Sequence, residues 1–361
     1  MPEILFLTRG HGFGHAARDL RVIRELRRRP GVTVRVLASG SALTYYRMRG
    51  VDCLPVAIPD EDDLGPGAAQ ALWRALAGLP RPDLVVSDEV PAALPFAERV
   101  WRRPCVLLLC ALNAEWGRPE ADRYLDGAAE VLVLDFPQTR APHYGTRAPL
   151  DFLGPVVERY AVGRADARRR LGLAERTEVG VLALGGMTGR PESRRMAAAA
   201  LRAWRAHARP GARLLVLAEP DPSLDDGGPG GGEVVWAGVS AEPELYYRAA
   251  DVVLNDAMGS NLCELAWNGV PAVALLDGAS AAEAPRTFHE RVRLLARERL
   301  IEAAAVEDGP AAVWQAVERA RAGAARPDAR EGFGWSSGGA VADRLLDALD
   351  RALGPAGAPR P

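Results

Sequence analysis

The same local pattern begins both halves of this chain: an apolar strand, a glycine-rich loop and a helix. In the first half, the apolar run at 4–7 leads into the glycine-rich stretch at 9–15, and a helical pattern follows. In the second half, the strand at 179–184, the loop at 185–189 and the helix at 194–207 repeat this order. Strands that alternate with helices in this way predict an α/β protein with parallel sheets covered by helices.

The repeated pattern and the length of 361 residues predict two Rossmann-like domains that face each other across a cleft. We expect the N-terminal domain to span 1–157 and the C-terminal domain 158–340. The final helix, at 341–353, is a candidate for crossing back to the first domain. The Pro/Gly-rich tail at 354–361 is expected to be disordered.

Composition limits the class of protein. An apolar content of 48% and a charged content of 25% are typical of a soluble globular protein, and a net charge of −2 argues against a nucleic-acid partner. No apolar run approaches the roughly 18 residues of a membrane span, and the N-terminus lacks the basic region of a signal peptide. The four cysteines lie in apolar segments without metal-ligand spacing, which indicates buried free thiols and a cytoplasmic protein. They are Cys53, Cys105, Cys110 and Cys263.

The first glycine-rich loop, Gly-His-Gly-Phe-Gly-His at 10–15, allows its backbone, including Gly14, to approach a ligand closely. His15 lies at the start of the following helix, where the positive end of the helix dipole favours a neutral imidazole that can accept a proton. His15 is therefore a candidate general base, although a histidine that only caps the helix gives the same pattern. His11 is better suited to contacting or orienting substrate.

The stretch 259–276 reads as a glycine turn, a short helix, a second turn and an apolar strand. Gly259 and Ser260 lie where the helix begins, so free backbone N–H groups point outward there, as in sites that bind phosphate. Glu264 follows one turn later, in position to hold the two hydroxyls of a ribose. An ordinary strand–helix–strand unit with a solvated glutamate is the alternative.

The spacing G-S-x3-E-L-x3-G-x-P-x-V in this stretch resembles the nucleotide-binding segment of GT-B glycosyltransferases. It is most similar to family 28, which includes the bacterial peptidoglycan N-acetylglucosaminyltransferase. The glycine loop that ends at His15 resembles the loop that carries the catalytic histidine of that family. A second loop, with Gly185, Gly186 and Thr188, resembles the diphosphate loop of that family. A third segment, with Gly238 and Val239, resembles the segment whose backbone contacts the base.

The resemblance implies an inverting glycosyltransferase of GT-B fold that takes a sugar from a nucleoside-diphosphate donor, with UDP as the expected nucleotide, without a further cofactor. Its acceptor would be a small molecule, a glycan or a lipid-linked sugar. The chain has no Asp-x-Asp pair at a strand end, in keeping with catalysis without a metal. Around Arg286 and Thr287 the paired glutamines of the peptidoglycan enzyme are missing, so a donor sugar other than N-acetylglucosamine is expected.

Residues at the ends of other expected strands are further candidates for contacting the acceptor or orienting His15. Asp88 and Glu89 close a strand and are placed either to orient His15 and bind acceptor hydroxyls, or to cap a helix before Pro91. Asn113 follows another strand end and is a candidate acceptor contact. The apolar residues of the helix at 68–79 form either a weak membrane-docking face or the core side of that helix.

Two rival functions remain open. The segment at 12–20 also resembles the loop of nucleotide-sugar hydrolases, in which water replaces the acceptor. A protein that binds a nucleotide sugar but no longer turns it over is the second rival.

Overall fold

The structure is a computed structural model, and it describes residues 1–10, 12–58, 66–110, 125–139, 146–184, 191–224, 230–256, 260–278, 286–323 and 333–354. The chain divides into two compact units, Met1–Val157 with Gly334–Pro361 and Glu158–Phe333. The second unit ends at Phe333 rather than at the boundary of 340 expected from the sequence. The expected disordered tail at 355–361 lies outside the described residues.

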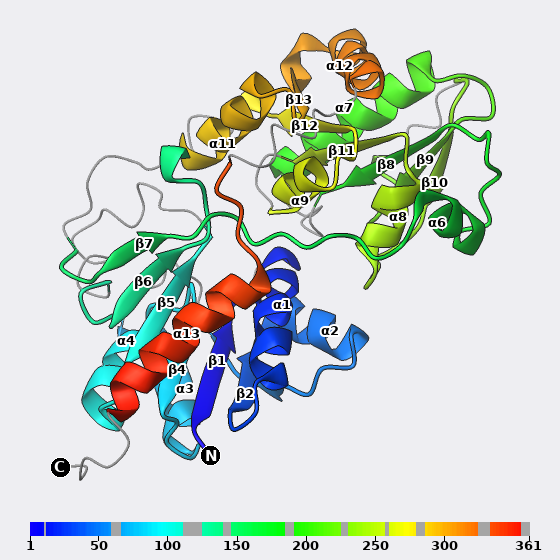
Figure 1. The fold of residues 1–361 in the computed structure, drawn as a ribbon. Coiled ribbons are helices and arrows are strands. Elements are labelled where there is room, and N and C mark those ends of the chain that lie inside the picture. Colours follow the sequence, from blue (N-terminus) through cyan, green and yellow to red (C-terminus); the bar gives the residue numbers. More distant parts are fainter. Residues whose placement is uncertain are drawn as a thin grey trace. The chain divides into compact units, whose positions relative to one another are not determined.

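The first unit is built on a parallel sheet of seven strands in the order β3-β2-β1-β4-β5-β6-β7 (Figure 1). Adjacent residues of β1 point to opposite faces and those at 4–8 are all fully buried, so helices must cover the sheet on both sides. The strands are β1 (Glu3–Thr8), β2 (Thr33–Ala38), β3 (Leu54–Pro55), β4 (Leu84–Asp88), β5 (Cys105–Leu109), β6 (Glu130–Val133) and β7 (Leu150–Phe152).

Each face of this sheet has its own apolar core. Ile4 and Phe6 of β1 belong to the cluster that includes α1, α2 and α13, whereas Leu5 and Leu7 belong to the cluster with α3 and α4. The alternation along one strand therefore fills two separate cores. The helices are α1 (Gly14–Arg28), α2 (Gly40–Met48), α3 (Pro66–Ala77), α4 (Ala93–Phe96), which continues as a π-helical turn (Ala97–Trp101), and α13 (Gly338–Leu353).

The terminal helix α13 packs against α1, so the last helix of the chain completes a core begun by the first (Figure 1). Ser337 caps it by accepting a hydrogen bond from the backbone N–H of Ala340 at 3.1 Å. A Cβ atom on Gly338 would lie 2.7 Å from the carbonyl carbon and oxygen of Arg21. The absence of a side chain at this glycine is what lets the two helices approach so closely.

The chain segments that leave and re-enter the first unit run side by side. Val156 and Ser336 form a parallel bridge, with hydrogen bonds of 3.0 Å from Val157 N to Ser336 O and from Ser336 N to Pro155 O. Gly154, with φ +84°, approaches so closely that a Cβ there would lie 1.7 Å from the carbonyl oxygen of Gly334. Glycine is required at Gly154 both by its φ and by this contact.

The second unit contains a parallel six-stranded sheet in the order β10-β9-β8-β11-β12-β13. Its strands are β8 (Val179–Ala183), β9 (Arg213–Val216), β10 (Glu233–Trp236), β11 (Val252–Asp256), β12 (Ala272–Leu276) and β13 (Glu302–Ala305). Its helices are α6 (Arg164–Arg170), α7 (Pro191–His207), α8 (Pro243–Ala249), α9 (Asn261–Trp267), α11 (Arg286–Arg297) and α12 (Pro310–Ala322). The expected α/β fold with parallel sheets is thereby confirmed.

Of the two interpretations of the helix at 68–79, the core side describes Leu72 and Leu76 of α3, which are fully buried. Trp73 is 37% exposed and donates its indole N–H to the carbonyl of Ala92 at 2.6 Å. The four cysteines were expected to be buried thiols, and none of them is in a disulfide, but Cys53 and Cys110 are only partly buried, which corrects that expectation. Within the described ranges, no helix is long and apolar enough to cross a membrane.

Candidate functional site

Charged side chains gather at the carboxyl ends of β1, β4 and β5 in the first unit. The strand register places Thr8, the last residue of β1, opposite Asp88, the last residue of β4. Gly14 is the first residue of α1, so His15 lies in the first turn of that helix. Parallel strands bring their carboxyl ends to one edge of a sheet, where open α/β proteins bind their ligands.

His15 and Asp88 form a hydrogen-bonded pair, with 2.8 Å between His15 Nδ1 and Asp88 Oδ2. Asp88 is fully buried, which alone would raise its pKa, but the charge of Arg18 and the hydrogen bond with His15 hold that pKa well below its usual range. An ionised carboxylate at this distance accepts the Nδ1 proton, and Nε2 therefore keeps its lone pair. Arg18 lies 3.4 Å from the same Nδ1, but the shorter contact with Asp88 decides the tautomer.

Glu89 brings a second carboxylate to the other side of the ring. Its Oε2 lies 3.7 Å from His15 Nε2 and accepts a 3.3 Å hydrogen bond from Arg9, while its Oε1 accepts the backbone N–H of Cys110 at 2.6 Å. Burial would raise the pKa of Glu89, but His15 and the positive charge of Arg9 lower it. The residue has φ +49°, a left-handed conformation that is uncommon outside glycine and is found at functional sites.

Buried groups behind the pair hold Arg18 in place. Asp19 lies beside Arg18, and its Oδ2 accepts a hydrogen bond of 2.9 Å from Thr8 Oγ1, which in turn lies 2.8 Å from the hydroxyl of Tyr46. Burial and the neighbouring Asp88 raise the pKa of Asp19 well above its usual range. Folding thus shifts the pKa values of the two aspartates in opposite directions, and Asp88, which is hydrogen-bonded to Nδ1, is the one placed to support a positive charge on the ring.

The sequence did not assign roles to Arg9, Arg18, Asp19, Thr8 or Tyr46. The signal for two of them was present, because residues three and four positions after His15 lie on the same side of a helix as the histidine. Charges at those positions, on the side that faces a strand end, indicate a buried network. The buried hydroxyls of Thr8 and Tyr46 gave no sequence signal.

In the second unit, the predicted nucleotide-binding residues follow β10 and β11. Gly238, with φ +72°, and Val239, which is 38% exposed, come directly after β10. Ser260 precedes α9, and Glu264 lies one turn into it with only 7% of its surface exposed. Since β10 and β11 are parallel members of one sheet, these loops leave the same edge.

The segment after Glu264 is fixed by an amide side chain. Asn268 donates to the carbonyls of Glu264 and Glu158 at 3.0 and 2.9 Å, and its Oδ1 accepts the backbone N–H of Tyr160 at 2.9 Å. This network ties the end of α9 to the first residues of the second unit. Glu264 therefore lies in a helix whose end is fixed by hydrogen bonds. It is buried, whereas the alternative of an ordinary strand–helix–strand unit expected a solvated glutamate.

Several predicted residues cannot be placed. His11, Asn113, Gly185, Gly186, Thr188 and Gly259 lie outside the described residues. Arg286 and Thr287 begin α11, and only their backbone is described. The structure thus brings His15, Asp88 and Glu89 together in the first unit, and Ser260 and Glu264 on one short segment of the second.

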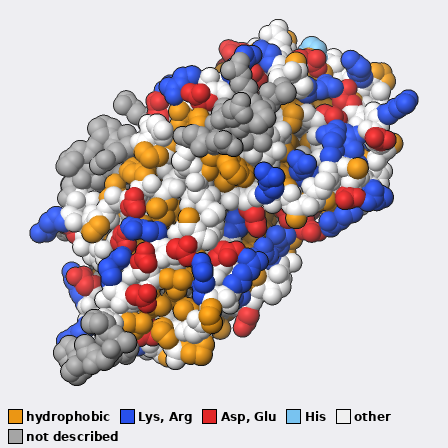
Figure 2. All heavy atoms as spheres, viewed as in Figure 1, with side chains coloured by type: hydrophobic (Ala, Val, Ile, Leu, Met, Phe, Trp, Pro, Cys, Tyr) orange, Lys and Arg blue, Asp and Glu red, His pale blue; other side chains and the backbone are white. Residues whose placement is uncertain are grey.

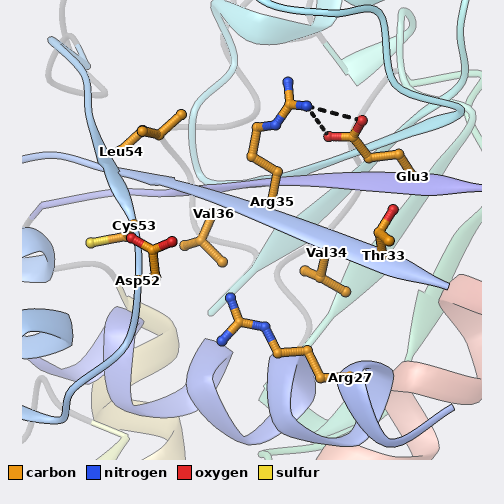
Figure 3. Close-up of a pocket in the computed structure, with 9 residues that line it drawn as sticks. All are labelled: Glu3, Arg27, Thr33, Val34, Arg35, Val36, Asp52, Cys53 and Leu54. Atoms are coloured by element: carbon orange, nitrogen blue, oxygen red, sulfur yellow. Dashed lines mark hydrogen bonds and ion pairs between the residues drawn. The ribbon is translucent and has the colours of Figure 1, made fainter.

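A separate hollow of about 420 Å³ lies along β2 and does not include the charged cluster. Figure 3 shows Arg35 paired with Glu3 on one side of the strand and Arg27 of α1 on the other, beside Val34 and Val36. Figure 2 shows basic and acidic side chains mixed over the face in view, in keeping with the net charge of −2.

No protein-family model and no curated protein matches the sequence. Solved structures do match. MurG from Acinetobacter baumannii covers 96% of this chain and 100% of its own, with a TM-score of 0.59 and 16% identity. The glycosyltransferase VinC, in complex with dTDP, covers 97% and 100%, with a TM-score of 0.64 and 16% identity.

The fold is GT-B. A protein from Listeria monocytogenes assigned as a UDP-N-acetylglucosamine 2-epimerase shares this GT-B fold, covering 100% of this chain and 98% of its own at a TM-score of 0.65 and 12% identity. At such identities the likeness extends to the fold and not to the reaction.

Proposed function

We propose that this chain is an inverting glycosyltransferase that uses a nucleoside-diphosphate sugar, with His15 as the general base. The observation that carries the proposal is the 2.8 Å bond between His15 Nδ1 and the buried, ionised Asp88. Such a pair leaves the lone pair on Nε2 and stabilises the imidazolium that forms when Nε2 takes a proton. Glu89, 3.7 Å from Nε2, adds to that stabilisation.

In the proposed reaction, His15 Nε2 takes the proton of an acceptor hydroxyl while that oxygen attacks the anomeric carbon of the sugar. The bond from the anomeric carbon to the diphosphate breaks on the opposite face, and the diphosphate leaves with the bonding pair. Inversion of the anomeric centre follows. Backbone N–H groups and hydroxyls can stabilise the departing charge without a metal.

The second unit is proposed to bind the donor through Gly238, Val239, Ser260 and Glu264, together with the undescribed glycine loops. Glu264 lies one turn after Ser260 in a helix whose end is held by Asn268, and this fixed position beside a helix N-terminus supports a ribose-binding role. The bound dTDP of VinC adds thymidine to uridine as a candidate nucleoside.

Donor binding is tested by calorimetry with UDP, dTDP, GDP and CDP on wild type, Glu264→Gln and the surface control Glu290→Gln. One diphosphate should bind wild type and the control equally. Its affinity should fall at least about tenfold in Glu264→Gln, because a buried hydrogen bond to a charged group contributes about 1.5–3 kcal/mol. Equal affinity in all three proteins would refute the role of Glu264.

A second candidate is epimerisation of a nucleotide sugar, favoured by the full-length match to the Listeria protein and by the second ionised carboxylate beside His15. One product assay separates the reactions. A transferase releases nucleoside diphosphate only when an acceptor is present, a hydrolase releases free sugar without one, and an epimerase converts the donor into its epimer with no release. No product with any donor would leave a binding protein.

A further inference from the structure

Within the described part of the chain, one group of three side chains brings potential metal ligands together. The ligand atoms of His15, Glu89 and Cys110 all lie within 4.8 Å of one another. Since His15 Nδ1 is bonded to Asp88, the ring atom left for a ligand is Nε2, which lies 3.7 Å from Glu89 Oε2. Ligand atoms around a tetrahedral zinc ion are about 3.3–3.8 Å apart. His15 Nε2 and Glu89 Oε2 are therefore already as far apart as two ligands of one zinc ion.

The three ligands come from neighbouring elements that fix their positions. His15 lies in the first turn of α1, Glu89 directly follows β4 and Cys110 directly follows β5. Glu89 is turned inward by its left-handed backbone and held there by the N–H of Cys110. Its side chain is 4% exposed, whereas that of His15 is 12% exposed and Cys110 is half-buried, which leaves an approach for an ion.

We propose that His15, Glu89 and Cys110 form a binding site for a thiophilic divalent cation such as Zn²⁺. One imidazole, one carboxylate and one thiolate are the donor types that zinc and cobalt prefer, and three protein ligands leave a fourth position for water. Asp88, bonded to the far nitrogen of His15, is the outer partner that metal-bound histidines usually have. On binding, the Cys110 thiol gives its proton to solvent and its sulfur bonds the ion.

The cation would be an inhibitor and not a cofactor, and this part rests on the proposed function. Coordination uses the lone pair of His15 Nε2, the same pair that would accept the proton of the acceptor. Glu89 Oε2 would exchange its long hydrogen bond from Arg9, at 3.3 Å, for a bond to the ion. The binding site itself depends only on the geometry of the first unit.

The test measures binding of Zn²⁺ and Co²⁺ to the full chain, in wild type, Cys110→Ser and Cys53→Ser. Cys53 is the matched control, because it is also a partly buried free cysteine and lies in the hollow along β2. Zinc affinity is measured by competition with a chromophoric chelator. Cobalt is followed by its thiolate charge-transfer absorption, which reports a cysteine ligand directly.

Wild type and Cys53→Ser should bind one ion and show the thiolate band. Cys110→Ser should lose the band and bind zinc more than about 100-fold more weakly, since even outer-shell changes cost about 10–100-fold. Absence of one-to-one binding, a band that persists in Cys110→Ser, or a band lost in Cys53→Ser would overturn the proposal. These readouts require no turnover, so they separate failure of the metal site from failure of the proposed reaction.

Discussion

A buried carboxylate at the end of β4 carries the electrostatics of the candidate site. Asp88 has no exposed surface, yet it stays ionised because the positive charge of Arg18 and the hydrogen bond with His15 outweigh the effect of burial. Such a group holds the histidine in one tautomer and strengthens it as a proton acceptor. A substitution that keeps the shape of Asp88 but removes its charge therefore tests the electrostatic role alone.

Asp88→Asn is expected to lower kcat by at least about 10²-fold with little change in the KM for the donor. The amide keeps the shape but no longer fixes the Nδ1 proton, and the corresponding change in a serine protease costs about 10⁴-fold. Steady-state kinetics on the substrate found by the product assay provide the measurement. Asp343→Asn is the control, because Asp343 pairs with Arg29 on the exposed face of α13. Undiminished kcat in Asp88→Asn would remove the base from the mechanism.

The two buried aspartates predict opposite effects of pH on stability. The pKa of Asp88 is lowered by folding, so its contribution is present above about pH 4, the unfolded value, and is lost as pH falls. The pKa of Asp19 is raised, so its contribution is present below about pH 4 and is lost as pH rises through the raised value. Thermal unfolding measured at several pH values between roughly 3 and 8 reports both contributions to stability.

Relative to wild type, Asp19→Asn should therefore gain stability as pH rises, whereas the deficit of Asp88→Asn should shrink as pH falls. The same slope in both variants would contradict the assigned charge states.

The sequence identified His15, Asp88 and Glu89 as candidates, because glycine loops and strand ends are visible in a pattern of residues. It did not identify the network behind them. Whether Arg18 meets Asp88 depends on the register Thr8 to Asp88, a pairing of strands that are far apart in the chain. The left-handed backbone of Glu89 is likewise set by packing and not by its residue type.

At the scale of elements, adjacent glycines at the start of α13 have different surroundings. A Cβ on Gly338 would meet the backbone of Arg21 at 2.7 Å, whereas a Cβ on Gly339 would have Ser337 Oγ as its nearest neighbour, at an ordinary 3.6 Å. The first glycine sets the separation of α13 from α1 and the second does not.

Gly338→Ala is expected to destabilise the first unit by about 1–3 kcal/mol, because the helices must move apart to fit the methyl group. Gly339→Ala should instead stabilise it by up to about 0.5–1 kcal/mol, through the lower backbone entropy of alanine. Urea unfolding followed by circular dichroism compares them. Equal effects at the two positions would mean that α13 does not pack as described.

Elements with a run of large apolar residues were predictable from the sequence, and elements without such a run were not. The apolar run at 4–7 and the strand expected to end at Asp88 correspond to β1 and β4. β3 and β7 have two and three residues and depend on pairing with a neighbouring strand for their existence. α2, α8, α12 and β13 also went unrecognised, because their apolar residues are too few or too small to give a clear period.

For the molecule as a whole, the paired segments at 154–157 and 334–336 are where the chain leaves and re-enters the first unit. Gly154→Ala should lower the thermal unfolding midpoint, because it adds the strain of a left-handed residue, about 1–2 kcal/mol, to a clash with Gly334. Each kcal/mol corresponds to about 2–4 °C in a unit of this size.

Gly163→Ala is the matched control, since Gly163 has φ −79° and no atom within 4 Å of its added Cβ. Its midpoint should match wild type. An unchanged midpoint in Gly154→Ala would show that the two segments are not held together.

The same pairing has a consequence for synthesis on the ribosome. The second unit is an insertion within the first, whose apolar core needs Val341, Leu345 and Leu349 from α13. Until those residues emerge, the face of α1 that they cover has no partner, although all of the sheet is already made. The first unit is thus translated first but completed last. The second unit can fold before α13 has been made to cover the core of the first unit.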